Sequence, residues 1–142
     1  MQSDSVGLFI SAWRQMTSRL PSPVYEEGGG IACCFCDAPN IFMNVWIQSQ
    51  PAQSSEKLDA MLALGRRKAD TSKNPIGGIL RKDWLPYGWE ARVSEYGLAP
   101  MVPMISMESD QILPPRREAP SIDIVRVTDD KSARDLAMLN AV

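Results

Sequence analysis

Three stretches of the chain place apolar residues at helical spacing. The first predicted helix has an apolar face made of Leu8, Phe9, Ala12, Trp13, Met16 and Leu20. A second helix is predicted to begin at Ser54 or Ser55, because serine is a favoured N-cap. Its apolar stripe consists of Leu58, Met61, Leu62 and Ala69. A short helix over residues 89–96 is expected to end at Gly97, where a left-handed cap fits.

The region between the first two helices has the pattern of β-strands. Residues 31–36 form a continuous apolar run. Residues 41–47 have the two-residue alternation in which successive side chains point to opposite faces of a strand. The turn-forming segment 37–40 lies between them, so an antiparallel hairpin is expected. A short strand at 24–27 precedes the hairpin, and Gly28-Gly29-Gly30 supplies a turn or bulge.

Two further strands are predicted at residues 76–82 and 101–107. Pro103 would place the second of these at a sheet edge or at a bulge, because proline lacks the N–H that a central strand needs. The whole pattern predicts an α+β (or α/β) fold, with a mixed, mainly antiparallel sheet of about five strands flanked by helices.

The composition of the chain changes after residue 110. Residues 111–121 are rich in proline, which is typical of an inter-domain linker. Residues 122–142 predict one strand and one helix, with Thr128 as the N-cap, and such a pair cannot bury its own apolar face. We therefore expect a first domain at 1–110 and the start of a second domain at 122–142. A homodimer completed through residues 122–142 of two chains is the alternative.

Overall composition excludes several functional classes. Of the 142 residues, 44% are apolar and 23% are charged, which is typical of a globular protein. The net charge of −2 argues against a nucleic-acid partner. The absence of histidine excludes Ser-His and Cys-His catalysis and histidine-ligated metals. No run is long enough to span a membrane and no export signal is evident, so a soluble, cytoplasmic protein is expected.

The three cysteines, Cys33, Cys34 and Cys36, lie within four residues of one another. Their spacing matches neither a C-x-x-C motif nor a zinc site. On an extended strand Cys33 faces one side of the sheet while Cys34 and Cys36 face the other. We expect buried thiols in the core, in a reducing compartment and with no metal.

Other candidate motifs have simpler explanations than catalysis. Glu26 and Glu27 are adjacent on a predicted strand and point to opposite faces, so they cannot act as a catalytic pair. The Gly28-Gly29-Gly30 segment leads into a strand, whereas phosphate-binding glycine loops lead into a helix. The basic run Arg66-Arg67-Lys68 suits the last turn of a helix, and no aromatic residues interleave it as single-stranded nucleic acid would require.

An aromatic cluster is the most promising candidate binding site. Trp84, Tyr87 and Trp89 lie within six residues, directly after a predicted strand. Large aromatic rings dominate many pocket mouths and protein interfaces. They also hold loops against a hydrophobic core. Both interpretations fit the sequence.

Two segments of the chain resemble GNAT-type N-acetyltransferases. Residues 124–141 are similar to the opening strand and helix of that domain. Residues 89–98, followed by 101–107, are similar to its late helix-to-strand passage, where a helix ends in a tyrosine-glycine-apolar step. The order of the predicted elements resembles bacterial proteins in which a degenerate GNAT-like half precedes a complete domain. The resemblance implies acetyl-CoA as the acyl donor and a small-molecule amine as the substrate.

One departure from the family concerns the cofactor. GNAT enzymes hold the pyrophosphate of acetyl-CoA with a (Gln or Arg)-x-x-Gly-x-(Gly or Ala) turn at a helix start, where backbone N–H groups stabilise the anion. No glutamine or arginine here has glycine three residues later, and residues 50–53 are Gln-Pro-Ala-Gln. We therefore expect residues 1–110 to be a non-catalytic half without a cofactor site or an assignable catalytic residue. The alternative is a stand-alone module that binds a small molecule or a protein through residues 84–89.

Overall fold

A computed structural model describes residues 5–105, 121 and 126–139. The chain divides into two compact units, Met1–Ser106 and Met107–Val142, which are described separately. The first unit contains, in order, α1 (Ser5–Thr17), β1 (Val24–Gly28), β2 (Ile31–Phe35), β3 (Val45–Gln48), α2 (Ser55–Thr71), β4 (Gly77–Ile79) and α3 (Trp89–Glu95). Short 3₁₀ turns at Ile41–Met43 and Lys82–Trp84 precede β3 and α3.

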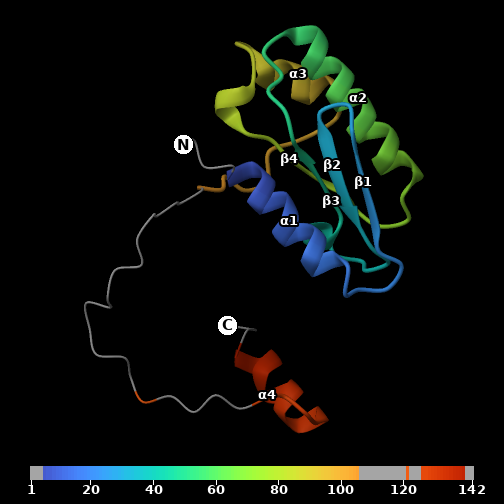
Figure 1. Ribbon diagram of the computed structural model, residues 1–142, viewed down its shortest axis with the longest axis vertical. Coiled ribbons are helices and arrows are strands. Elements are labelled where there is room, and N and C mark those ends of the chain that lie inside the picture. The colour runs from blue at the N-terminus through green and yellow to red at the C-terminus, as the bar shows by residue number, and fades with distance from the viewer. Residues whose placement is uncertain (1–4, 106–120, 122–125, 140–142) are drawn as a thin grey trace. The chain divides into compact units, whose positions relative to one another are not determined.

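The four strands form one mixed sheet in the order β1-β2-β3-β4. The first three strands are antiparallel neighbours, and α2 then carries the chain across to β4, which runs parallel to β3. Helix α1 lies against one face of the sheet, and α2 and α3 lie on the other side (Figure 1). This arrangement confirms the predicted α+β fold with a mainly antiparallel sheet, with four strands in place of about five.

Helix α1 covers the sheet with part of the predicted face. Ile10 and Thr17 are its buried residues, and Phe9 and Trp13 of the predicted stripe pack against the same core. Leu8, Ala12 and Met16 are exposed, so the predicted stripe was wrong at these three positions. The hydroxyl of Thr17 donates to the Trp13 carbonyl oxygen at 3.0 Å, which lets a polar residue be buried where apolar periodicity would not place it.

The α2–α3 side of the sheet carries the larger core. Trp46 of β3 is 1% exposed and lies against Gly65 of α2 and Gly78 of β4. A methyl group at either glycine would overlap the indole ring, so both positions require the absence of a side chain. The buried residues of this cluster are Ile31, Cys33, Trp46, Ala52, Leu58, Met61, Leu62 and Val93. The core is thus continuous from β2 to α3.

Strand β3 begins four residues later than predicted. The buried side chain of Asn44 accepts a hydrogen bond from the Cys36 N–H at 2.9 Å and donates to the carbonyl oxygens of Ala38 and Asn40 at 2.7 and 3.0 Å. These bonds close the β2–β3 connection as a compact loop, and Ile41–Met43 forms a 3₁₀ turn within it. The prediction of a strand over 41–47 was therefore correct only from Val45 onward.

The strands predicted at 76–82 and 101–107 are shorter or missing. β4 covers only Gly77–Ile79 because the chain turns into the 3₁₀ segment Lys82–Trp84. Residues 101–105 form no strand and are exposed, while 106 and 107 lie outside the described residues. Pro103 is consistent with this result, since it cannot donate to a sheet ladder.

In the second unit the described residues include one helix, α4 (Asp130–Leu139). The predicted linker and strand lie largely outside the described residues, and residues 126–128 form no strand. Thr128 was predicted as the N-cap, but the Asp129 carboxylate accepts the hydrogen bond from the Ser132 N–H at 2.7 Å. Asp129 is therefore the capping residue. Across the described parts of the chain, no helix has the length and apolar character needed to cross a membrane.

Candidate functional site

The aromatic segment 84–89 connects the end of β4 to α3. Its start is fixed to the core by two hydrogen bonds, from the Ala52 N–H to the Trp84 carbonyl oxygen at 3.0 Å and from the Arg81 N–H to the Gln48 Oε1 atom at 3.0 Å. Gly88 then adopts a left-handed conformation, with φ of 76°, and leads into the first turn of α3. The loop is thus anchored at its start and turns sharply at its end.

The three rings of this segment have different environments. Trp89 packs against the α2–α3 core, and Tyr87 is fully exposed to solvent. The Arg81 guanidinium lies over the Trp84 ring, with its central carbon 5.0 Å from the ring centroid, a cation–π contact. The three predicted residues therefore lie on one loop but in three different environments.

A shallow groove of about 470 Å³ lies at the turn into α3. Its lining residues are Lys82, Leu85, Pro86, Tyr87, Gly88, Trp89 and Glu90. Lys82 and Glu90 were not singled out from the sequence. Their closeness in the sequence to the aromatic residues 84–89 could have identified them, because a charged side chain next to an exposed ring commonly orients a polar ligand. The groove combines an apolar floor with one cationic and one anionic group, which suits binding rather than proton transfer.

The start of α2 is where the resemblance to GNAT enzymes leads us to look for an anion site, and its donors are already used within the chain. Ser54 is the N-cap, and its hydroxyl oxygen accepts from the Lys57 N–H at 3.3 Å. Hydrogen bonds from the Glu56 backbone N–H and from Ser54 lower the pKa of the Glu56 carboxyl group. A carboxylate and a serine hydroxyl thus take up the first-turn donors that a phosphate group would need.

The cysteines are buried and free, as predicted. Burial raises the pKa of the Cys33 and Cys34 thiols to about 11, so neither is a thiolate nucleophile near neutral pH. Within the described parts of the chain, His, Cys, Asp and Glu side chains form no group of three that could hold a metal ion.

The two glutamates of β1 make separate contacts. Glu26 forms an ion pair with Lys68 of α2, and Glu27 accepts a hydrogen bond from the Tyr25 hydroxyl at 2.8 Å. Their partners lie on opposite sides of the strand, in agreement with the predicted opposite orientations. These carboxylates have structural partners and do not share a site.

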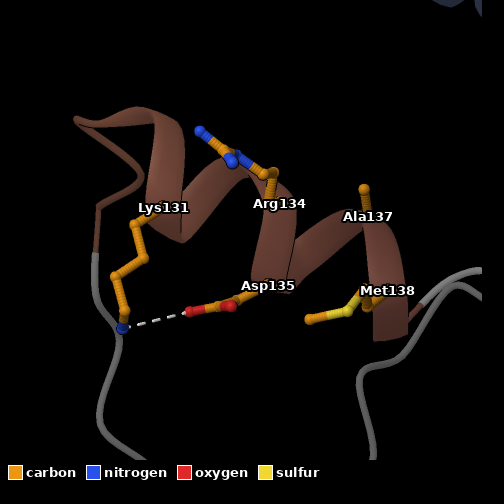
Figure 2. Close-up of a pocket in the computed structure, with 5 residues that line it drawn as sticks. All are labelled: Lys131, Arg134, Asp135, Ala137 and Met138. Carbon is orange, nitrogen blue, oxygen red and sulfur yellow. Dashed lines mark ion pairs between the residues drawn. The ribbon is translucent and has the colours of Figure 1, made fainter.

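In the second unit, a concave surface of about 660 Å³ lies along α4. Figure 2 shows Lys131 and Asp135 pointing toward one another, with 3.5 Å between the ammonium nitrogen and the carboxylate oxygen, while Arg134 points to another side of the helix. Ala137 and Met138 complete the lining. Exposed ion pairs of this kind contribute little to stability.

Comparison with known proteins found no matching family model, no matching curated protein and no matching solved structure.

Proposed function

We propose that the first unit is a non-catalytic, GNAT-like half of an acyl-CoA-dependent N-acetyltransferase. The observation that carries this proposal is the order of its elements, in which three antiparallel strands are followed by a β3–α2–β4 crossover and a second short helix. Such a half would shape the side of the enzyme that receives the amine substrate. The acyl donor would be acetyl-CoA, held by residues outside this unit.

The start of α2 supports the non-catalytic part of the proposal. In the family that the sequence resembles, backbone N–H groups at a helix start hold the cofactor's pyrophosphate. Here Ser54 caps that position and the negatively charged Glu56 follows it. Two features therefore disfavour the binding of a pyrophosphate here: Glu56 would repel it, and residues 53 and 55 are not glycine.

Titration of acetyl-CoA into the 142-residue chain, combined with thermal melts, tests this assignment. We expect no binding heat and no shift of the melting temperature, because a ligand that binds the folded state raises that temperature. Micromolar binding to the native chain would contradict the non-catalytic assignment.

A designed variant tests the resemblance itself. Gln53→Gly, Ser55→Gly and Glu56→Gln together create the spacing Gln50-x-x-Gly-x-Gly and remove the charge that would repel a pyrophosphate. We expect this triple variant to acquire measurable affinity for acetyl-CoA. The matched control, Gln53→Ala, Ser55→Ala and Glu56→Gln, lacks the glycine backbone and should show none. Equal behaviour of the two variants would contradict the assignment of this helix start.

The groove beside Tyr87 favours a second candidate, a small-molecule or protein binding module. A fully exposed tyrosine on an anchored loop is a typical contact residue, since its ring adds contact area at little entropic cost. A screen of small aromatic and cationic fragments, followed by NMR at the Trp89 indole N–H, tests this candidate. We expect shifts that Tyr87→Ala abolishes; shifts that persist in this variant, or shifts confined to other surfaces, would contradict it.

A further inference from the structure

Strand β4 has a free edge. It is the last strand of the sheet, and among the residues that the structure describes it pairs only with β3. The Gly77 N–H donates to the Asn44 carbonyl oxygen at 2.9 Å, so the hydrogen-bonding groups of Gly77 face β3. Because these groups alternate in direction along a strand, the N–H and C=O of Gly78 point outward. Gly78 is exposed, so this donor and acceptor are open to another strand.

The two edges of the sheet differ in how they are protected. The β1 edge carries the charged residues Glu26 and Glu27, and charge is a common device against unwanted strand pairing. Around β4, residues 76–80 are Ile-Gly-Gly-Ile-Leu, with no charged residue and no proline. Charge and proline, two of the features that commonly prevent strand addition, are therefore absent from residues 76–80 at the β4 edge.

The same unit carries an unpaired segment that suits this edge. Residues 101–105 are Met-Val-Pro-Met-Ile, a sequence with the composition of a strand, yet they form none. The side chains of Met101, Val102, Met104 and Ile105 are 55–88% exposed. Adjacent exposed apolar side chains of this size are typical of interaction surfaces.

We propose that two copies of this chain form a dimer in which residues 101–105 of each copy add as a strand to the β4 edge of the other. Each copy supplies one donor segment and one acceptor edge, so a twofold arrangement satisfies both at once. Pro103 sets the register because it has no N–H and must face away from β4. The N–H groups of Val102 and Met104 then face the acceptor edge around Gly78.

Pro103 also explains why the assembly stops at two copies. In the added strand, it occupies the outer edge, where a further strand would need an N–H donor. Strand addition therefore closes on itself and does not continue into a fibre.

The size of the contact is consistent with a dimer that dissociates readily. The four donor side chains are about two-thirds exposed, and each can bury roughly 60–120 Å² of apolar surface. Two donors bury roughly 500–1,000 Å² and the edges that they cover bury a comparable area, so the total of roughly 1,000–1,900 Å² begins at the lower limit of specific interfaces. We therefore expect dissociation in the micromolar range.

Sedimentation equilibrium of the full chain, from about 1 to about 300 µM, tests the proposal. We expect a monomer–dimer equilibrium in the native protein. Met104→Pro removes an N–H that faces β4, and should weaken the dimer at least about tenfold. The matched control Ile105→Pro also exchanges one apolar side chain of the contact for a proline ring, but it removes an N–H that faces outward, so it should weaken the dimer clearly less than Met104→Pro does. Both residues are exposed in the single chain, so thermal melts of the dilute variants should match the native melt.

Four results would overturn the proposal. The first is a monomer throughout this concentration range. The second is a dimer that Met104→Pro leaves intact, which would place the contact elsewhere, for example on α4. The third is equal weakening by the two proline variants. The exchange of the Gly78 amide hydrogen is an independent readout, and it should slow as the dimer forms. The fourth result that would overturn the proposal is unchanged exchange of this hydrogen in a formed dimer.

Discussion

Neighbouring thiols on β2 are buried by different parts of the molecule. Cys33 belongs to the core under α2 and α3, and Cys34 belongs to the core under α1. Both have a pKa raised to about 11, with burial as the leading cause. In the unfolded chain the same thiols ionise near pH 9.0. Ionisation therefore favours the unfolded state above that pH.

The stability of the fold should accordingly fall between pH 9 and pH 11. Below pH 9 both states keep the thiols protonated, and stability is unaffected by them. Between the two values, each thiol removes up to about 1.4 kcal/mol of unfolding free energy per pH unit. Urea denaturation of the native chain and of Cys33→Ala with Cys34→Ala across this range measures the effect. An equally steep fall in the double variant would show that other groups cause it.

At the scale of secondary-structure elements, Trp46 fixes the distance between β3, α2 and β4. Its ring fills the space left by Gly65 and Gly78. Close packing of this kind leaves no room for an added methyl group, and overpacked cores force neighbouring elements apart. The glycines therefore set how closely α2 approaches the sheet.

We expect Gly78→Ala to reduce the free energy of unfolding by about 1–3 kcal/mol, because the new methyl group overlaps the Trp46 ring. Gly28→Ala is the matched control: it also lies in a strand, and an added Cβ there meets no atom within 4 Å. The control should stay within about 0.5 kcal/mol of the native protein. Urea denaturation measures both, and equal effects would contradict the role of Trp46.

Sequence reasoning predicted the helices better than the strands. Helix caps depend on local signals, and Ser54 and Gly97 act at the ends where they were expected. The late start of β3 depends on the hydrogen bonds of the Asn44 side chain to the backbone of the preceding loop. The spacing of apolar residues carries no information about such bonds. In the candidate site, Tyr87 and Trp89 line one groove, whereas Trp84 lies in the 3₁₀ turn Lys82–Trp84 and contacts Arg81. Such turns arise from tertiary contacts rather than from local composition.

At the scale of the whole first unit, the sheet separates two hydrophobic cores. One lies under α1 and includes Ile10, and the other lies under α2 and α3 and includes Leu58. Successive side chains of a strand point to opposite faces of the sheet, and the two clusters share no residue. Each core therefore contributes to the stability of the same sheet through separate contacts.

Substitutions in the two cores should be additive. We expect Ile10→Ala and Leu58→Ala each to cost about 2–5 kcal/mol, and the double variant to match their sum within about 0.5 kcal/mol. Leu8→Ala, on the exposed side of α1, is the control and should change stability by less than about 0.5 kcal/mol. Chemical denaturation of the four variants measures these values. A large coupling energy would mean that the sheet transmits strain between its faces.

The contact of Trp46 with two glycines also constrains the order in which this sequence can change over evolution. A larger residue at 65 or 78 is tolerated only after Trp46 has been replaced by a smaller side chain. Replacement of Trp46 alone leaves a cavity, so the first step costs stability whichever position changes first. Related sequences should therefore vary at these three positions jointly, with either one large ring facing two glycines or a smaller core residue facing larger neighbours.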